Sequence, residues 1–504
     1  MLKDPFSAFY CCQNKQHISF ILAVLFMVGT FTSCNNNPTL KSRPATAEQS
    51  GIKPVYGAPP EAKPLPPHHV PVNRYLLDGR NGIHYDTYNS DVTNDMGPMG
   101  EHPSVITRKL NSLGKSVPTA LFDSKGRLIT VMITFTSTYL YLMDPDSLFI
   151  LAEERLPRKS NIHIFNHEEN DASGGGYLHI TPSDQVIVPK MDKKIAFYEV
   201  VEDQEKPRWN LVKEIDLSGL LPEKAYINDA VPDYDGQMWF TTSMGIVGYV
   251  DKNSGEVNTY SFPEGLQNQV AIDSTGVYVL THAYLNKLSI KNDGEIKLEW
   301  RSEYDNSAGL NGLVSSGSGT SPTLFGNNDN LIAIADNGTP QMHLNVYHRG
   351  DGHLICSVPV FSTGNTGCEN SPIGYGNDVI IEDNGGFELF FGDPQNTNKG
   401  LIRIHVLDDL SGAEIVWGSY DLKASTTPTL STANGLIYSY CVKEGNNGSN
   451  AWFMSLVDWE TGETVYEYWV GSGRNFPDML QPVVIYDGAF YIGTRTGILV
   501  VRDH

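Results

Sequence analysis

The stretch Thr427-Pro428-Thr429-Leu430, followed by Asn434-Gly435 and the run Leu436–Tyr440, contains the pattern that decides the fold. A proline opens a short β-type run, an amide or acidic residue followed by glycine ends it, and a second β-type run follows. Such a residue pair supplies the positive φ that a tight hairpin turn requires. The stretch therefore predicts two antiparallel strands joined by a tight turn.

The same pattern recurs along the chain, with starts near residues 118, 181, 231, 270, 321, 372, 428 and 482. Several units also carry a later turn of the form Asp-x-x-Ser/Thr-Gly, most completely at Asp458–Glu463. The gaps between starts run from 39 to 63 residues, close to a four-stranded propeller blade with variable loops. We therefore expect an all-β protein, a single β-propeller with eight four-stranded blades. Seven blades stay open, because the copy at 270 begins only 39 residues after its neighbour.

The end of the chain is too short to form a complete blade. Only about 22 residues follow the last start, enough for two strands. Closure of the ring therefore needs strands from before residue 118, such as Ser104–Leu110. Sharing of this kind ties the two ends of the propeller together and hides sheet edges that would otherwise pair with other chains.

The first residues form an export signal. The apolar run Ile18–Phe31 is short of the roughly 20 residues that span a bilayer, and it is typical of a signal peptide. Thr32-Ser33-Cys34 resembles a bacterial lipobox, which implies cleavage before Cys34 and lipid attachment to it; the alternative is a plain secretory signal. We expect a lipoprotein signal over 1–33, a Pro-rich extended linker over 34–72 and the propeller over 73–504.

Composition limits the function classes. The chain has 504 residues, 40% of them hydrophobic, and a formal net charge of −22. The apolar content excludes wholesale disorder, and the acidic balance argues against a nucleic-acid partner, which requires a basic face. The expected location is the bacterial cell envelope, facing the periplasm or on the outer membrane, with the membrane contacted through the lipid.

The blade turns carry a family resemblance. The Asp-x-x-Thr-Gly-x-x-x-aromatic segment Asp458–Tyr466 resembles the quinoprotein alcohol dehydrogenase-like, or PQQ-binding-like, β-propeller superfamily. The segments Gly317–Arg349, Cys356–Phe361 and Glu369–Ser371 are similar to an uncharacterised group of exported bacterial proteins within it. The resemblance covers about residues 80–504 and implies the propeller fold.

True quinoprotein dehydrogenases differ from this sequence. They place a tryptophan-docking motif in nearly every blade and commonly use a disulfide between adjacent cysteines, whereas the one adjacent pair here, Cys11-Cys12, lies in the expected signal. PQQ is therefore not the expected cofactor. The many Asp and Asn side chains would suit calcium, but no complete EF-hand is present, and the cofactor and any metal stay open.

Polar residues just before each repeat proline should face one rim of the central channel, where side chains from separate blades converge on a ligand. The alternative is that they cap strand ends or bind channel water. His282 should lie at a strand end, where a ligand-binding role and a packing role are equally expected. The candidate ligand-binding residues are Asn228, Asp229, His282, Thr320, Ser321, Glu369, Asn370, Thr426 and Gln481.

Histidines supply the candidate catalytic groups, since an imidazole titrates near neutral pH and serves as a general base. His163, His167 and His179 lie in a segment rich in acidic residues and glycine, which is a candidate binding loop or a solvated insertion. His84 lies in the segment Gly82–Asp91, which lacks strand alternation and should lie across the propeller face. Packing of its tyrosines onto the rim would explain that segment equally well.

Three functions follow from this sequence. The first is binding of a small molecule or glycan at the channel mouth. The second is an enzyme, a carbohydrate-active lyase or hydrolase, with a PQQ-like oxidoreductase as a further variant. The third is a scaffold for envelope proteins. Export also permits one disulfide, whose pairing among Cys356, Cys368 and Cys441 the sequence leaves open.

Overall fold

The computed structural model describes residues 43–44, 50–110, 115–134, 137–157, 176–202, 206–307, 317–362, 364, 366–386, 396–446, 448–478 and 482–504. The chain divides into two units, Met1–Lys41 and Ser42–His504, and everything described below belongs to the second. Within the described ranges no helix has the length and apolar content needed to cross a membrane.

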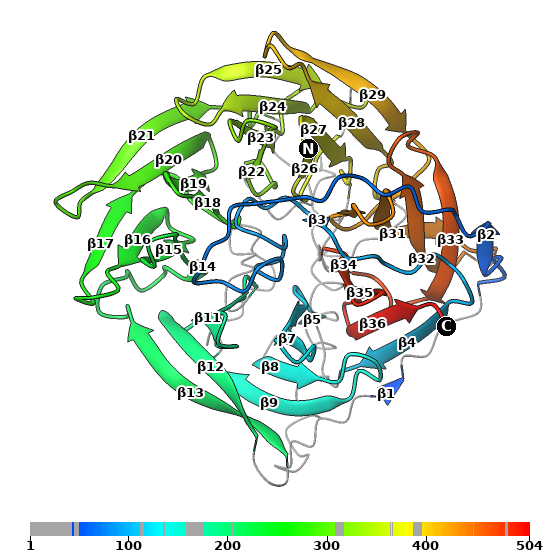
Figure 1. Ribbon diagram of the computed structural model, residues 1–504, viewed down its shortest axis with the longest axis horizontal. Helices are drawn as coiled ribbons and strands as arrows, with labels where there is room; N and C mark the ends of the chain where they lie inside the picture. Colours follow the sequence, from blue (N-terminus) through cyan, green and yellow to red (C-terminus); the bar gives the residue numbers. More distant parts are fainter. Residues whose placement is uncertain are drawn as a thin grey trace, which may run out of the picture. The chain divides into compact units, whose positions relative to one another are not determined.

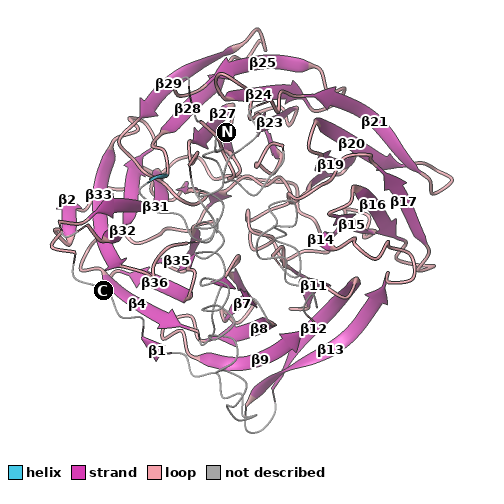
Figure 2. Ribbon diagram, turned by 180° about the vertical axis from the view of Figure 1, so that it is seen from behind, coloured by secondary structure: helices cyan, strands magenta, loops and turns pink. Residues whose placement is uncertain are grey.

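Eight sheets are arranged in a ring in the described part of the second unit (Figure 1), and Figure 2 shows that they are built from strands and loops. The prediction of an eight-bladed all-β propeller is confirmed, and the seven-bladed alternative is excluded. Blade 1 contains β5 (Lys115–Ser116), β6 (Leu121–Phe122), β7 (Leu128–Thr134), β8 (Thr138–Met143) and β9 (Ile150–Leu156), and blade 2 contains β10 (His179–Ile180), β11 (Val186–Lys190), β12 (Lys194–Glu202) and β13 (Pro207–Asp216). Blade 3 contains β14 (Ile227–Pro232), β15 (Met238–Thr242), β16 (Ile246–Val250) and β17 (Val257–Ser261), and blade 4 contains β18 (Ala271–Asp273), β19 (Gly276–Leu280), β20 (Tyr284–Ile290) and β21 (Ile296–Glu303).

The other four blades follow in chain order, and the first-named strand of each lies innermost. Blade 5 contains β22 (Thr323–Phe325), β23 (Leu331–Ala335), β24 (His343–His348) and β25 (Leu354–Pro359), and blade 6 contains β26 (Ile373–Tyr375), β27 (Asp378–Glu382), β28 (Leu401–Val406) and β29 (Ala413–Ser419). Blade 7 contains β30 (Thr429–Ser431), β31 (Leu436–Glu444), β32 (Asn450–Asp458) and β33 (Thr464–Ser472), and blade 8 contains β34 (Val484–Tyr486), β35 (Ala489–Gly493), β36 (Gly497–Arg502) and β4 (Ser104–Lys109). Three short strands lie at sheet edges: β1 (Arg43–Pro44), β2 (Val55–Gly57) and β3 (Val92–Thr93).

Blade 8 is closed by a strand from the other end of the propeller. β4 pairs antiparallel with β36, from Ser104 opposite Arg502 to Lys109 opposite Gly497. This is the segment that the sequence predicts for closure. The pairing removes the edge that β36 would otherwise expose.

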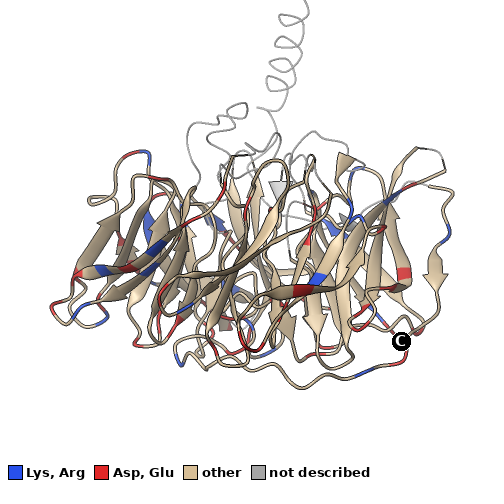
Figure 3. Ribbon diagram, turned by 90° about the horizontal axis from the view of Figure 1, so that it is seen from above, with Lys and Arg blue, Asp and Glu red and all other residues tan. Residues whose placement is uncertain are grey.

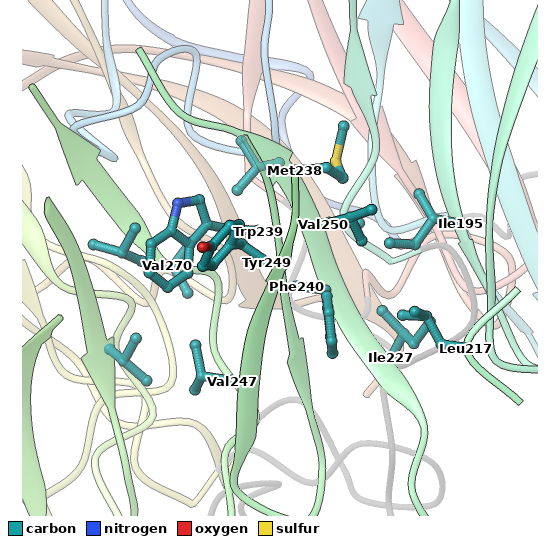
Figure 4. Close-up of a cluster of buried hydrophobic side chains, with 14 of the residues drawn as sticks. Ile195, Leu217, Ile227, Met238, Trp239, Phe240, Val247, Tyr249, Val250 and Val270 are labelled. Carbon is teal, nitrogen blue, oxygen red and sulfur yellow. The ribbon is translucent and has the colours of Figure 1, made fainter. Parts of the chain in front are cut away.

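The apolar core lies between neighbouring blades. All five residues of β15 are buried, because both faces of this strand pack against other sheets. Figure 4 shows Trp239 beside Val270 at blade 4, and Phe240 on the opposite side of the strand, nearer Leu217 of blade 2. The outer strand β13 is instead mostly exposed or half-buried, and Trp209 is its one buried residue. In side view (Figure 3), acidic and basic residues are interspersed along the strands and loops of the blades.

The described part of the expected linker, residues 50–72, is extended and bound to the propeller. β2 adds to the outer strand of blade 7, and Lys63 N–H donates to Asn434 O at 2.9 Å. Gly435 permits this approach, since its φ is +69° and a Cβ there would lie 2.2 Å from Lys63 O. This part of the segment is therefore held along the blades rather than kept free as a spacer.

Residues 73–95, which we call the plug, cross the centre of the ring. Backbone carbonyls of the plug accept N–H groups from the innermost strands of blades 4, 5, 6 and 7. Left-handed φ values at Tyr85, Asn89 and Asp91, between 53° and 72°, turn successive carbonyls outward. The four bonds are Ile272 N to Thr87 O (2.7 Å), Leu324 N to Tyr88 O (2.8 Å), Gly374 N to Ser90 O (2.9 Å) and Leu430 N to Asp91 O (3.0 Å).

Side chains and backbone of the plug reach the remaining blades. Leu77 N–H donates to Ile180 O of blade 2, and the Tyr85 hydroxyl accepts Ile485 N–H of blade 8 at 2.6 Å. Asn73 and Arg80 donate to backbone oxygens of blades 3 and 1. The plug thus bonds to all eight blades. The side of the ring at which the innermost strands end is called the plug face, and the side at which they begin is called the start face.

Candidate functional site

His84 is the central side chain of the plug. Its Nδ1 lies 2.9 Å from Asp91 Oδ1, and its Nε2 lies 3.2 Å from Ser371 Oγ, in the loop before β26. All three residues are at most 5% exposed. Both ring nitrogens of this imidazole are therefore engaged.

The hydrogen-bond network fixes the tautomer of His84. Ser371 Oγ accepts Ser321 N–H at 3.1 Å, so its own proton is free to point at His84 Nε2. His84 then carries its proton on Nδ1 and donates it to Asp91. Burial raises the pKa of Asp91 to about 6, although His84 beside it favours the ionised form. This triad ties the plug to blades 5 and 6.

His179 forms the second histidine–carboxylate pair. Its Nε2 lies 2.9 Å from Asp229 Oδ1, a contact between blades 2 and 3, and Asp229 Oδ2 accepts Val270 N–H at 3.3 Å. His179 Nδ1 is buried and has no hydrogen-bond partner among the described residues. Donation of Nε2–H to the carboxylate leaves a lone pair on Nδ1, the arrangement of an oriented general base.

Asn89 links the second pair to the plug. Its amide donates to Val270 O at 3.3 Å and to Pro322 O at 3.0 Å, and it accepts from Gln269 at 3.0 Å. Val270 thus contacts Asp229 through its N–H and Asn89 through its carbonyl. The two histidine–carboxylate pairs belong to one continuous polar network.

Glu382, at the end of β27, is a buried acid in blade 6. It accepts a hydrogen bond from the Asn370 amide, and its Oε2 has no partner among the described residues. Burial raises the pKa of Glu382 well above its ordinary value, and the nearby carboxylates of Asp478, Asp383 and Asp91 add to this rise. Burial therefore favours the protonated form of this side chain.

Charges from blades 2, 3 and 6 act on one another across the ring. Tyr177 precedes β10, and burial raises the pKa of its hydroxyl, with the carboxylates of Asp229 and Glu369 adding to the rise. Glu369 is half-buried in the loop before β26. Acidic groups of blades 3 and 6 therefore both contribute to the electrostatic environment of Tyr177.

Two other predicted rim residues use their side-chain polar atoms in hydrogen bonds to the backbone. The Asn228 amide donates to Leu266 O at 2.8 Å, and Thr320 Oγ1 accepts Ala335 N–H at 3.2 Å. Thr426 is fully buried. These residues join neighbouring strands and blades.

His282 is separate from this network. It lies at the turn between β19 and β20, and a Cβ added to Gly265 would lie 2.7 Å from its Cε1. Burial lowers the pKa of His282. Among the described contacts it shares none with His84 or His179, and its predicted role at the rim stays a prediction. His163, His167, Gln481 and Cys34 lie outside the described residues.

Sequence reasoning missed two members of the network. Ser371 ends the segment Glu369–Ser371 that carries the resemblance, but its contact with His84 joins residues 287 positions apart. Glu382 ends the apolar strand β27, and a carboxyl directly after three apolar residues is the signal that could have found it.

A hollow lies on the plug face between the plug and blades 1 and 8. Arg80, Tyr85, Asp95 and Tyr486 are among its lining residues, and the Arg80 guanidinium lies 4.7 Å from the Tyr486 ring centroid. Burial raises the pKa of Asp95, while Arg80 opposes this. The hollow contains neither histidine of the network.

The three body cysteines are free thiols. Cys368 and Cys441 are buried, and Cys356 is half-buried. Burial raises the pKa of Cys356 to about 11 and that of Cys441 to about 12. The disulfide that the sequence left open is not formed among these residues.

No protein-family model matches the chain. A protein of Archaeoglobus fulgidus named "Uncharacterized protein" is 25% identical over 298 residues, which cover 51% of this chain and 57% of that relative. Among solved structures, the computationally designed Ika8 protein is matched over 82% of this chain and 100% of its own, with 10% identity and a TM-score of 0.45. Virginiamycin B lyase from Staphylococcus aureus is matched over 70% of this chain and 96% of its own, with 13% identity and a TM-score of 0.38.

Proposed function

We propose that this propeller binds a small polar molecule, such as a neutral glycan, at the start face of its ring. The observation that carries the proposal is a pair of buried, unpartnered polar atoms, His179 Nδ1 and Glu382 Oε2, in blades 2 and 6. Leaving a buried donor or acceptor unsatisfied costs about 1–3 kcal/mol. Two such atoms on opposite sides of a shared polar network are suited to a ligand that bonds both.

The charges of the network select the chemistry of the ligand. His179 Nδ1 offers an acceptor, and burial favours the protonated form of Glu382, which donates; Asp229, Glu369 and Asp91 add carboxylates to this set of groups. An anionic ligand would meet like charge. A sugar hydroxyl both donates and accepts, so a neutral or amino sugar fits this set of groups.

The test is a thermal-shift series on the full chain in detergent, with neutral, amino and acidic sugars. A ligand at 100 times its Kd stabilises the folded state by about 2.7 kcal/mol, and a neutral or amino sugar should raise the melting temperature. His179→Gln and Glu382→Gln should each weaken binding about fivefold, the loss expected from one hydrogen bond. The exposed His69→Gln is the matched control. Binding that is equal in all four proteins would refute this site.

A second candidate is acid–base catalysis on a carbohydrate, by a lyase or hydrolase. It is favoured by the orientation of His179, whose Nε2 lies 2.9 Å from Asp229 and whose Nδ1 is left to accept a proton. Turnover of the bound sugar that is lost in His179→Gln, with binding retained at higher ligand concentration, would favour the enzyme. Binding without turnover would support the first proposal and contradict the second.

We also infer export and lipid anchoring from the leader, and kinship with the PQQ-binding-like superfamily from the Asp458–Tyr466 turn. No quinone is proposed, because the sequence lacks the adjacent-cysteine pair beside the propeller. Incorporation of a labelled fatty acid in cells should depend on Cys34 and be absent in Cys34→Ser. Equal labelling of both proteins would contradict the anchor.

A further inference from the structure

A second polar cluster lies on blade 5, at the turn that joins β24 to β25. Nδ1 of His348 lies 2.8 Å from Asp351 Oδ1, and Nδ1 of His353 lies 2.7 Å from the same oxygen. The two imidazole rings are stacked, with centroids 5.0 Å apart. Across the described ranges this is the one group of three His, Cys, Asp or Glu residues with ligand atoms within 4.8 Å of one another.

The turn presents these side chains on a fixed backbone. His348 N–H donates to His353 O, and Gly352 N–H donates to His348 O, both at 2.9 Å. Gly352 has a φ of +74° and packs on the Trp300 indole, where a Cβ would lie 2.5 Å from a ring carbon. A side chain at this position would displace the turn.

Arg349 anchors the turn from the buried side. Its guanidinium lies 3.2 Å from Asp273 Oδ2, and its carbonyl accepts Trp300 Nε1–H at 3.2 Å. The neighbours of Arg349 are therefore directed outward, and the side chains of Asp351 and His353 are more than half exposed. Three ligand atoms are thus held together on a rigid hairpin and open to solvent.

We propose that His348, Asp351 and His353 form a surface site for a divalent transition-metal ion of the zinc class. Imidazole nitrogens and carboxylate oxygens bind zinc at about 2.0–2.2 Å, so tetrahedral ligands lie about 3.3 Å apart. The present contacts of 2.7 and 2.8 Å need to widen by only about 0.5 Å. Two nitrogen ligands favour zinc, copper or nickel over calcium and magnesium, which prefer oxygen.

Metal binding requires the lone pair of each Nδ1, so the metal ion would replace the Nδ1–H···Oδ1 hydrogen bonds and each imidazole would keep its proton on Nε2. The three residues supply three positions, and a water molecule completes the tetrahedron. This site is separate from the polar network that contains His84 and His179, and it does not depend on the proposed sugar ligand.

The test is a zinc titration of the full chain in competition with a fluorescent chelator. Other histidines also contribute to the total zinc bound, so wild type is compared with variants of the site. Wild type should bind one zinc ion more than His348→Gln, Asp351→Asn or His353→Gln at micromolar zinc. His405→Gln is the matched control, since His405 contacts one carboxylate, Asp378, without a second imidazole. Cobalt should give the intense visible absorption of a tetrahedral site, which each of the three variants should lose.

Two results would overturn the proposal. The first is an equal zinc stoichiometry in wild type and in all three variants. The second is displacement of zinc by millimolar calcium, which would contradict the assigned ion class. Because the Asp351 and His353 side chains are more than half exposed, the melting temperatures of Asp351→Asn and His353→Gln without metal should stay within the error of wild type, so folding failure does not obscure the comparison.

Discussion

Asp91→Asn should stabilise the propeller at neutral pH, although it alters the partner of a buried histidine. The Asp91 carboxyl has a pKa of about 6 in the folded protein against an ordinary value of 3.8. A tenfold difference in proton affinity corresponds to about 1.4 kcal/mol, so the ionised carboxylate costs about 3 kcal/mol relative to the protonated one. Asparagine resembles the protonated acid in shape and charge, and its Oδ1 can still accept His84 Nδ1–H.

The pH dependence follows from the direction of this shift. The folded state binds the Asp91 proton more readily than the unfolded chain does, so the contribution of Asp91 is most favourable below about pH 4 and declines as the pH rises through 6. Wild type and Asp91→Asn should therefore be equally stable at pH 4. At pH 7.5 the variant should be more stable by up to about 3 kcal/mol, or several degrees in melting temperature.

The assay is urea denaturation followed by tryptophan fluorescence at both pH values. The two proteins share every other acid, so their difference reports Asp91 together with its effect on Glu382, whose pKa Asp91 helps to raise. Asp235→Asn is the control at an exposed carboxylate and should have no effect. A variant that is less stable than wild type at pH 7.5 would refute the reasoning, because the ionised Asp91 would then be net stabilising.

Three further changes test the plug, the bound N-terminal segment and the thiols. Tyr85→Phe removes the hydroxyl that accepts the buried Ile485 N–H at 2.6 Å, and should lower the free energy of unfolding by about 1–3 kcal/mol. The control is Tyr420→Phe at an exposed tyrosine, which should have no effect. An unchanged stability in Tyr85→Phe would contradict the plug contact. Gly435→Ala strains a φ of +69° and meets Lys63 O, so limited proteolysis within residues 50–72 should become faster; unchanged cleavage would show that this segment is not held there. Buried thiols should resist Ellman's reagent at pH 8 until the protein unfolds, and rapid reaction in the native state would contradict their burial; the protected residues are Cys368 and Cys441.

The blades could be predicted because each is encoded locally. A proline, a β-type run and an Asn-Gly or Asp-Gly turn fall within about a dozen residues, and hairpin geometry depends on those residues alone. The closing strand followed from counting what the last blade lacked. β4 and β36 pair across 400 residues, yet the need for such a strand was visible at one end of the chain.

The site was less predictable because its contacts join distant residues. His84 and His179 were identified from their chemistry, but the sequence did not indicate that Ser371 would meet one and Asp229 the other. Asn228 and Thr320 lie where the repeat places them, yet their polar atoms are used by neighbouring backbone groups. Which polar group retains a free atom depends on packing between blades, and a linear pattern does not contain that information.

The plug also determines how a ligand can be recognised. The carbonyls of Thr87, Tyr88, Ser90 and Asp91 already occupy the N–H groups that the innermost strands of blades 4 to 7 would otherwise offer. At these four positions a ligand would therefore have to displace the plug in order to pair with the strands, the mode used when peptides add to sheet edges. While the plug is in place it has to bond side chains instead, and the buried atoms without partners, His179 Nδ1 and Glu382 Oε2, belong to side chains. This argument favours a compact polar molecule over an extended peptide as the occupant of the ring.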